Sequence, residues 1–81
     1  MSLTLDERVA RFARRAADLA HRVADASMDP DLAHREADLL LEIGRGLVPE
    51  VKAAGVGALE GRLRDALILV NNARSGRSKG R

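Results

Sequence analysis

The chain has 81 residues, of which 46% are hydrophobic, and its 14 basic and 12 acidic side chains give a net charge of +2. It contains no cysteine and a single aromatic residue, Phe12, which excludes disulfides, thiolate metal sites and an aromatic platform for stacked nucleic-acid bases. This length fits one small domain, and because its core is small we expect very good helix packing or association with other chains to supplement it.

The first predicted helix covers residues 4–27. Thr4 and Glu7 form a capping-box pattern, in which a hydroxyl and a carboxylate each satisfy a backbone N–H at a helix start. Apolar residues then recur at alternating steps of four and three, which predicts one buried stripe along this helix. The stripe consists of Leu5, Val9, Phe12, Ala16, Leu19, Val23 and Ala26.

Alanines beside that stripe widen the apolar face to about half of the helix. Their small side chains allow close approach of another helix, so we expect the first helix to contact two neighbours. Three of these alanines are assigned to a contact with a second copy or another partner: Ala13, Ala17 and Ala20.

The second predicted helix covers residues 30–45. Asp29 suits the N-cap and Pro30 the first helical position. One side of this helix is apolar, which predicts that it packs against the rest of the bundle. That side holds Leu32, Ala33, Ala37, Leu39, Leu40, Leu41 and Ile43.

Glu36 falls inside this apolar arc, where a carboxylate must find a partner or take up a proton. One interpretation is that Glu36 is buried and meets an arginine of the first helix. The candidates, spaced by seven residues, are Arg8, Arg15 and Arg22. The other interpretation is that Glu36 sets the register or partner choice of an oligomer, because a misplaced chain would leave it unpaired.

Glycine and proline predict the remaining boundaries. Gly44, Gly46 and Pro49 indicate a break after the second helix, followed by a short helix over residues 49–54. The last helix covers residues 58–73 and is either bent or preceded by that short helix. Its predicted core side holds Leu59, Leu63, Ala66, Leu67 and Val70.

A second, smaller apolar face is predicted on the last helix. Gly57, Gly61 and Ile68 share a side away from the core residues, and Leu69 also fits no core position. Small residues four apart permit close helix contact, so we assign these four residues to an intersubunit or partner contact. The alternative is that the last helix is wedged between the other two.

Residues 74–81 consist only of Ser, Gly, Lys and Arg, and this composition predicts a disordered tail. All its charges are basic: Arg74, Arg77, Lys79 and Arg81. Such a tail is consistent with three roles: a solubilising terminus, transient nucleic-acid contact, or binding of an acidic protein partner. Four charges neutralise about four phosphates, which is enough for auxiliary binding only.

No pattern indicates a cofactor, a metal site or a small-molecule substrate. His21 and His34 lie on polar helix sides, and neither has the histidine four residues away that a helical metal pair needs. Gly55 and Gly57 do not complete a nucleotide fingerprint, since no strand precedes them. No apolar run approaches the roughly 20 residues that span a bilayer, so we expect a cytoplasmic protein without membrane contact.

The sequence therefore predicts an all-α protein. Residues 1–73 form one small antiparallel bundle of three main helices, completed by homo-oligomerisation, most simply as a dimer. The predicted function is a non-enzymatic protein–protein interaction module that acts as an adaptor, regulatory or assembly protein. The alternative is a small nucleic-acid-binding regulator that uses the basic tail and the arginine-rich first helix, and a contiguous arginine surface would favour it. An enzyme would need a second carboxylate or histidine beside Glu36.

Overall fold

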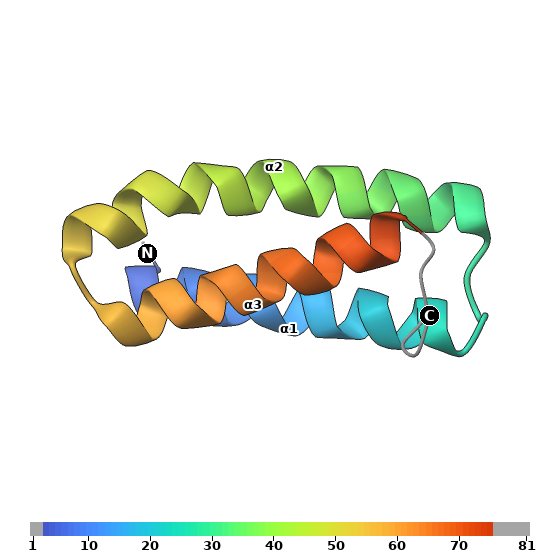
Figure 1. Cartoon of the computed structure of the whole chain (residues 1–81), viewed down its shortest axis with the longest axis horizontal. Coiled ribbons are helices and arrows are strands. Elements are labelled where there is room, and N and C mark those ends of the chain that lie inside the picture. Colours follow the sequence, from blue (N-terminus) through green and yellow to red (C-terminus); the bar gives the residue numbers. More distant parts are fainter. Residues whose placement is uncertain (1–2, 76–81) are drawn as a thin grey trace.

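The computed structural model of the chain describes residues 3–75. Three helices make up most of this part: α1 (Leu5–Ala24), α2 (Pro30–Ala54) and α3 (Gly57–Arg74). Each helix packs against both others, and no strand occurs within residues 3–75. In Figure 1, α1 runs along the long axis, α2 returns above it, and α3 runs again in the direction of α1. The predicted all-α fold with three packed helices is confirmed.

The start of α1 is the predicted capping box. The Glu7 backbone N–H donates to Thr4 Oγ1 at 3.2 Å, and the Thr4 N–H donates to Glu7 Oε1 at 3.0 Å. This hydrogen bond to the Thr4 backbone, with a second one to its side chain, lowers the pKa of the Glu7 carboxyl. The sequence signal for the helix start is therefore realised in full.

The end of α1 comes earlier than predicted. Ala26 has φ 56°, the left-handed conformation that terminates helices, and its N–H donates to the carbonyl of Val23. The Ser27 N–H donates to the carbonyl of Arg22, which completes a Schellman-type end. The prediction of a helix to residue 27 is three residues too long, because an alanine occupies the position where glycine is usual.

The predicted break after residue 45 is wrong, since α2 continues through Gly44, Gly46 and Pro49 to Ala54. Gly44 is buried for a packing reason. A Cβ there would lie 2.7 Å from Cζ of Phe12 and 2.5 Å from Cδ2 of Leu67, so only glycine leaves room for both side chains.

Pro49 lies inside α2 without ending it. Proline removes one helical hydrogen bond, but the buried Leu47 and Val51 on either side of it hold the last two turns against the core. The helix ends instead at Gly55, whose φ of 67° is the left-handed conformation that favours glycine. The predicted separate helix over residues 49–54 is therefore the last part of α2, and α3 begins directly at Gly57.

One hydrophobic core lies between the three helices. The predicted stripe of α1 supplies Val9, Phe12, Ala16 and Leu19, and α3 supplies most of its predicted core side. No charged or polar residue within residues 3–75 is buried. The buried hydrophobic residues of α2 are Ala33, Ala37, Leu40, Leu47 and Val51.

Within residues 3–75, none of the helices is both long enough and apolar enough to cross a membrane.

Candidate partner-binding surfaces

A row of large apolar side chains on α2 is exposed to solvent. Leu32, Leu39 and Ile43 are 49%, 56% and 45% exposed, and we call them the α2 stripe. Each of them directly precedes a buried residue of α2, namely Ala33, Leu40 or Gly44. Neighbouring residues of an α-helix differ in direction by about 100°, so the stripe is rotated by that angle from the core side of α2. The stripe continues toward Gly46, where a Cβ would meet no atom within 4 Å. No helix within residues 3–75 covers this row.

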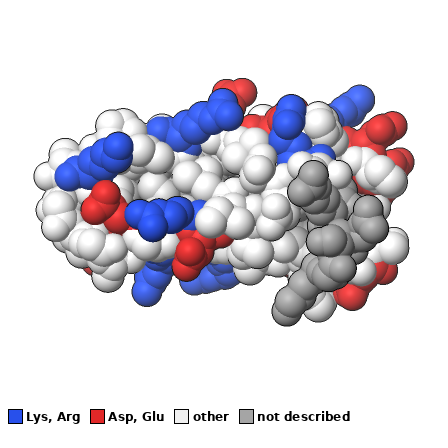
Figure 2. Space-filling view, viewed as in Figure 1, with Lys and Arg blue, Asp and Glu red and all other residues white. Residues whose placement is uncertain are grey.

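A second uncovered apolar surface is a groove between α2 and α3, with a volume of about 490 Å³. Its apolar lining includes Leu41 and Val48 from α2, and Leu67 and Ile68 from α3. Ile68 is 53% exposed. Its charged lining consists of Arg45, Lys52, Glu60 and Arg64. Figure 2 shows the molecule from the same side as Figure 1, with basic and acidic side chains interspersed on a surface that is otherwise uncharged. We call this the α2–α3 groove.

The four residues predicted to form a contact on α3 are not all brought together. Ile68 lines the α2–α3 groove, whereas Gly57, Gly61 and Leu69 are not part of its lining. Gly57 is exposed, Gly61 is half-buried, and Leu69 is 39% exposed. A Cβ on either glycine would meet no atom within 4 Å, so no other helix within residues 3–75 packs closely on them.

The alanine side of α1 faces the bundle only in part. Ala13 is partly buried and packs against the core of its own chain, Ala20 is half-buried, and Ala17 is exposed. The prediction that the first helix contacts two neighbours is confirmed, because α1 packs against both α2 and α3. An intermolecular role of these alanines stays a prediction.

The prediction that Glu36 is buried is wrong. Glu36 is half-buried and lines a hollow between α1 and α2, together with Arg14, Arg15 and Arg22, so that solvent reaches its carboxylate. Arg22 itself pairs with Asp18, with 3.2 Å between Nε and Oδ2. None of the ion pairs found within residues 3–75 includes Glu36.

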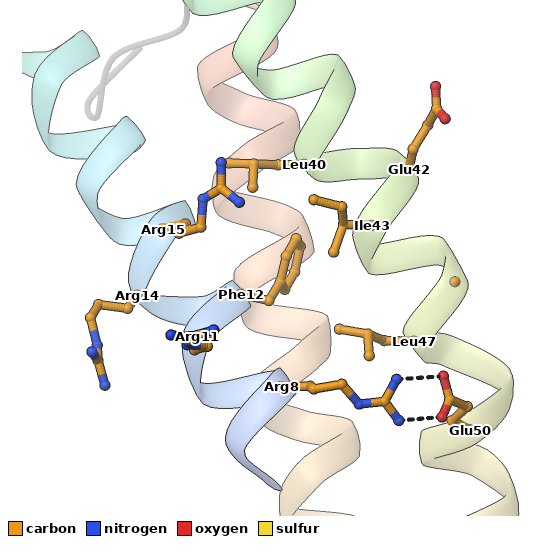
Figure 3. A pocket seen from close by; sticks show the side chains of 11 residues that line it. Arg8, Arg11, Phe12, Arg14, Arg15, Leu40, Glu42, Ile43, Leu47 and Glu50 are labelled. Atoms are coloured by element: carbon orange, nitrogen blue, oxygen red, sulfur yellow. Dashed lines mark hydrogen bonds and ion pairs between the residues drawn. The ribbon is translucent and has the colours of Figure 1, made fainter. Parts of the chain in front are cut away.

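A larger groove of about 690 Å³ follows the same seam between α1 and α2 (Figure 3). Phe12, Leu40 and Leu47 form its floor, and Ile43 of the α2 stripe lines one side. The α1 side carries four arginines, of which Arg8 pairs with Glu50 of α2. This hydrogen-bonded pair lowers the pKa of the Glu50 carboxyl and raises that of the Arg8 guanidinium. The other three arginines are Arg11, Arg14 and Arg15.

Arg74 belongs to the folded body, so the predicted tail does not begin there. It is the last residue of α3, and its Nε donates to Oδ1 of Asp38 on α2. The hydrogen bond from Arg74 lowers the pKa of the Asp38 carboxyl. His34 joins this cluster, with Nε2 3.5 Å from Asp38 Oδ2. The other predicted tail cations, Arg77, Lys79 and Arg81, lie outside the described residues.

Comparison with known proteins gives no further guide to these surfaces. No protein-family model matches the chain, and no curated protein or solved structure shows significant similarity to it.

Proposed function

We propose that the chain is a non-catalytic protein–protein interaction module that associates with copies of itself and acts in the cytoplasm as an adaptor, regulatory or assembly protein. In this proposal a second copy completes an antiparallel helical bundle, and a dimer is the smallest functional unit. The observation that carries the proposal is the presence of two uncovered apolar surfaces, the α2 stripe and the α2–α3 groove, on so small a chain.

The energetics favour covering these surfaces. Fully burying a Leu or Ile side chain contributes about 1.5–3 kcal/mol, so each half-exposed side chain gains on the order of 1 kcal/mol when a partner covers it. Four such residues are Leu32, Leu39, Ile43 and Ile68. The side chains already sit on ordered helices, so an association through them orders little additional backbone.

Absolute mass in solution tests the proposal. Light scattering behind a sizing column, over a range of protein concentrations, is expected to give a mass of two or more subunits. A mass of one subunit at every concentration would contradict the proposed association.

A nucleic-acid-binding regulator is the second candidate, because Arg11, Arg14 and Arg15 line one groove together. If they contact phosphates, replacing all three by glutamine flattens the dependence of log affinity on log salt concentration by about 2.7. Anisotropy of a labelled DNA duplex measures this slope, with Arg62→Gln as the control. Removing residues 76–81 tests the remaining tail cations in the same assay. Unchanged binding in both variants would exclude the two basic regions as the contact.

A further inference from the structure

The α2–α3 groove combines an apolar lining with three basic side chains and one carboxylate. Arg45, Lys52 and Arg64 are exposed, and Glu60 is half-buried. Within residues 3–75, none of these four takes part in an ion pair. We infer that this groove binds an acidic amphipathic helix of a different protein, whose apolar face enters the groove and whose aspartates and glutamates meet these cations.

The groove offers apolar contact on both of its walls. Leu41 and Val48 lie on the α2 wall, and Leu67 and Ile68 lie on the α3 wall. The first three are half-buried against the core, whereas Ile68 is 53% exposed. Apolar side chains of a partner remove this remaining surface from water, which a phosphate backbone cannot do. The lining therefore favours a protein segment over a nucleic acid.

The spacing of the lining residues fits a helix as the occupant. Each wall contains a row of residues at successive steps of four, three and four, which lie on one side of a helix. The rows are Leu41, Arg45, Val48 and Lys52 on α2, and Glu60, Arg64, Leu67 and Asn71 on α3. Each row extends over about 16 Å, or three helical turns, so a partner helix of about 12 residues spans the groove.

A second copy of this chain does not match the charge of the groove. The α2 stripe is the longest row of exposed large apolar side chains within residues 3–75. Its Ile43 lines a groove together with arginines of α1, namely Arg11, Arg14 and Arg15. Seating the stripe of a second copy in the α2–α3 groove would bring cations toward cations, which is unfavourable. The charges of residues 76–81 are basic as well, so this segment of the chain does not suit the groove either.

The groove stays accessible when the α2 stripe is covered. Residues two apart on an α-helix differ in direction by about 200°. Leu39 belongs to the stripe and Leu41 to the groove, so the two surfaces lie on opposite sides of α2. The chain can therefore join a copy through the stripe and an acidic partner through the groove, as an adaptor does. Binding of the acidic helix goes beyond the proposed self-association and does not depend on it.

Selection from a displayed library of amphipathic helical peptides of about 15 residues supplies the probe, with the wild-type chain as bait. The enriched peptides are expected to carry Leu or Ile at steps of three and four. They are also expected to contain more Asp and Glu than Lys and Arg. Enrichment of neutral or basic peptides, or of none, would overturn the inference.

Fluorescence anisotropy with a labelled, enriched acidic peptide locates the contact. Arg64→Glu reverses a charge at the groove, and Ile68→Glu places a charge on its apolar wall. Each variant is expected to weaken peptide binding by at least about 10-fold. A peptide with Lys in place of its Asp and Glu is expected to bind Arg64→Glu more tightly than the wild type. Unchanged affinity of the acidic peptide in both variants would overturn the inference.

Arg62→Glu and Leu69→Glu are the matched controls, because both residues are exposed on α3 and neither lines the groove. Both variants are expected to leave the affinity for the acidic peptide unchanged. Circular dichroism checks that each variant keeps its helicity. Arg64→Glu alone decides the test if Ile68→Glu loses helicity.

The outcomes separate this inference from the proposed self-association. A wild-type chain that is monomeric at every concentration but binds the acidic peptide overturns self-association and leaves the groove assignment standing. A wild-type oligomer that dissociates in Ile68→Glu but not in Leu69→Glu places a second copy in the groove and overturns the acidic partner. A labelled DNA duplex that binds the wild type but not Arg64→Glu, without any peptide binding, overturns it as well.

Discussion

α2 carries two neighbouring rows of apolar residues, of which one is buried and the other is exposed to solvent. The buried row has small residues at three positions, Ala33, Ala37 and Gly44, and other helices approach it closely. The neighbouring row, the α2 stripe, has larger side chains and stays exposed. Since a helix cannot approach bulky residues as closely, the row of smaller residues lies in the core, and the row of larger residues is exposed to solvent.

The largest expected difference between the two rows comes from Leu40 and Leu39. Leu40 is 3% exposed, so Leu40→Ala removes buried atoms and is expected to lower the free energy of unfolding by about 2–5 kcal/mol. Leu39→Ala, measured at a concentration where the chain is monomeric, is expected to change it by no more than about 0.5 kcal/mol. Urea denaturation measures both. Equal losses would contradict the assignment of the two rows.

The two glycines of α2 give a smaller effect of opposite sign. Gly44→Ala is expected to destabilise the protein by about 1–3 kcal/mol, because the new methyl group collides with Phe12 and Leu67. Gly46→Ala meets open space and is expected to stabilise the helix by about 0.5–1 kcal/mol. Thermal denaturation compares the stabilities of the two variants. A stabilising Gly44→Ala would contradict the close packing of Phe12 and Leu67 on Gly44.

The smallest effect concerns the ion pairs that tie α2 to its neighbours, Arg8–Glu50 and Asp38–Arg74. Both carboxyl pKa values are lowered in the folded chain, so their stabilisation is present above the unfolded value of about 4 and is lost as pH falls through the lower folded values. The double variant Glu50→Gln/Asp38→Asn is expected to lose less stability than the wild type as the pH falls from about 6 to about 2.5. Parallel pH profiles would argue against these pairs.

The sequence predicts the helices and the α1 part of the core well, because their signals are local. The capping box at Thr4 and the steps of four and three along α1 need no knowledge of the neighbours. The start of α2 is equally local, since Asp29 accepts from the N–H of Asp31 and Pro30 follows it.

The errors arise where tertiary packing decides. In the sequence Gly44 indicates a helix end. In the structure it lies inside α2, where the missing side chain leaves room for Phe12 of α1. Taking Gly44 as a break hides the continuous buried row of α2. It also hides the α2 stripe, whose residues then look like core. The apolar arc of α2 predicts a buried Glu36 because Leu32 and Ile43 are counted as core residues, whereas both are exposed and Glu36 is half-buried.

The close fit of Phe12 over Gly44 also fixes how far along α2 the first helix can lie. Sliding α1 by one turn, about 5.4 Å, would bring the ring against the side chain of Leu40 or Leu47, where no space is left by a missing Cβ. The alanines elsewhere on α1 are nearly alike in shape and offer little resistance to such sliding. The fit of this ring over this glycine thus contributes to the axial alignment of α1 on α2.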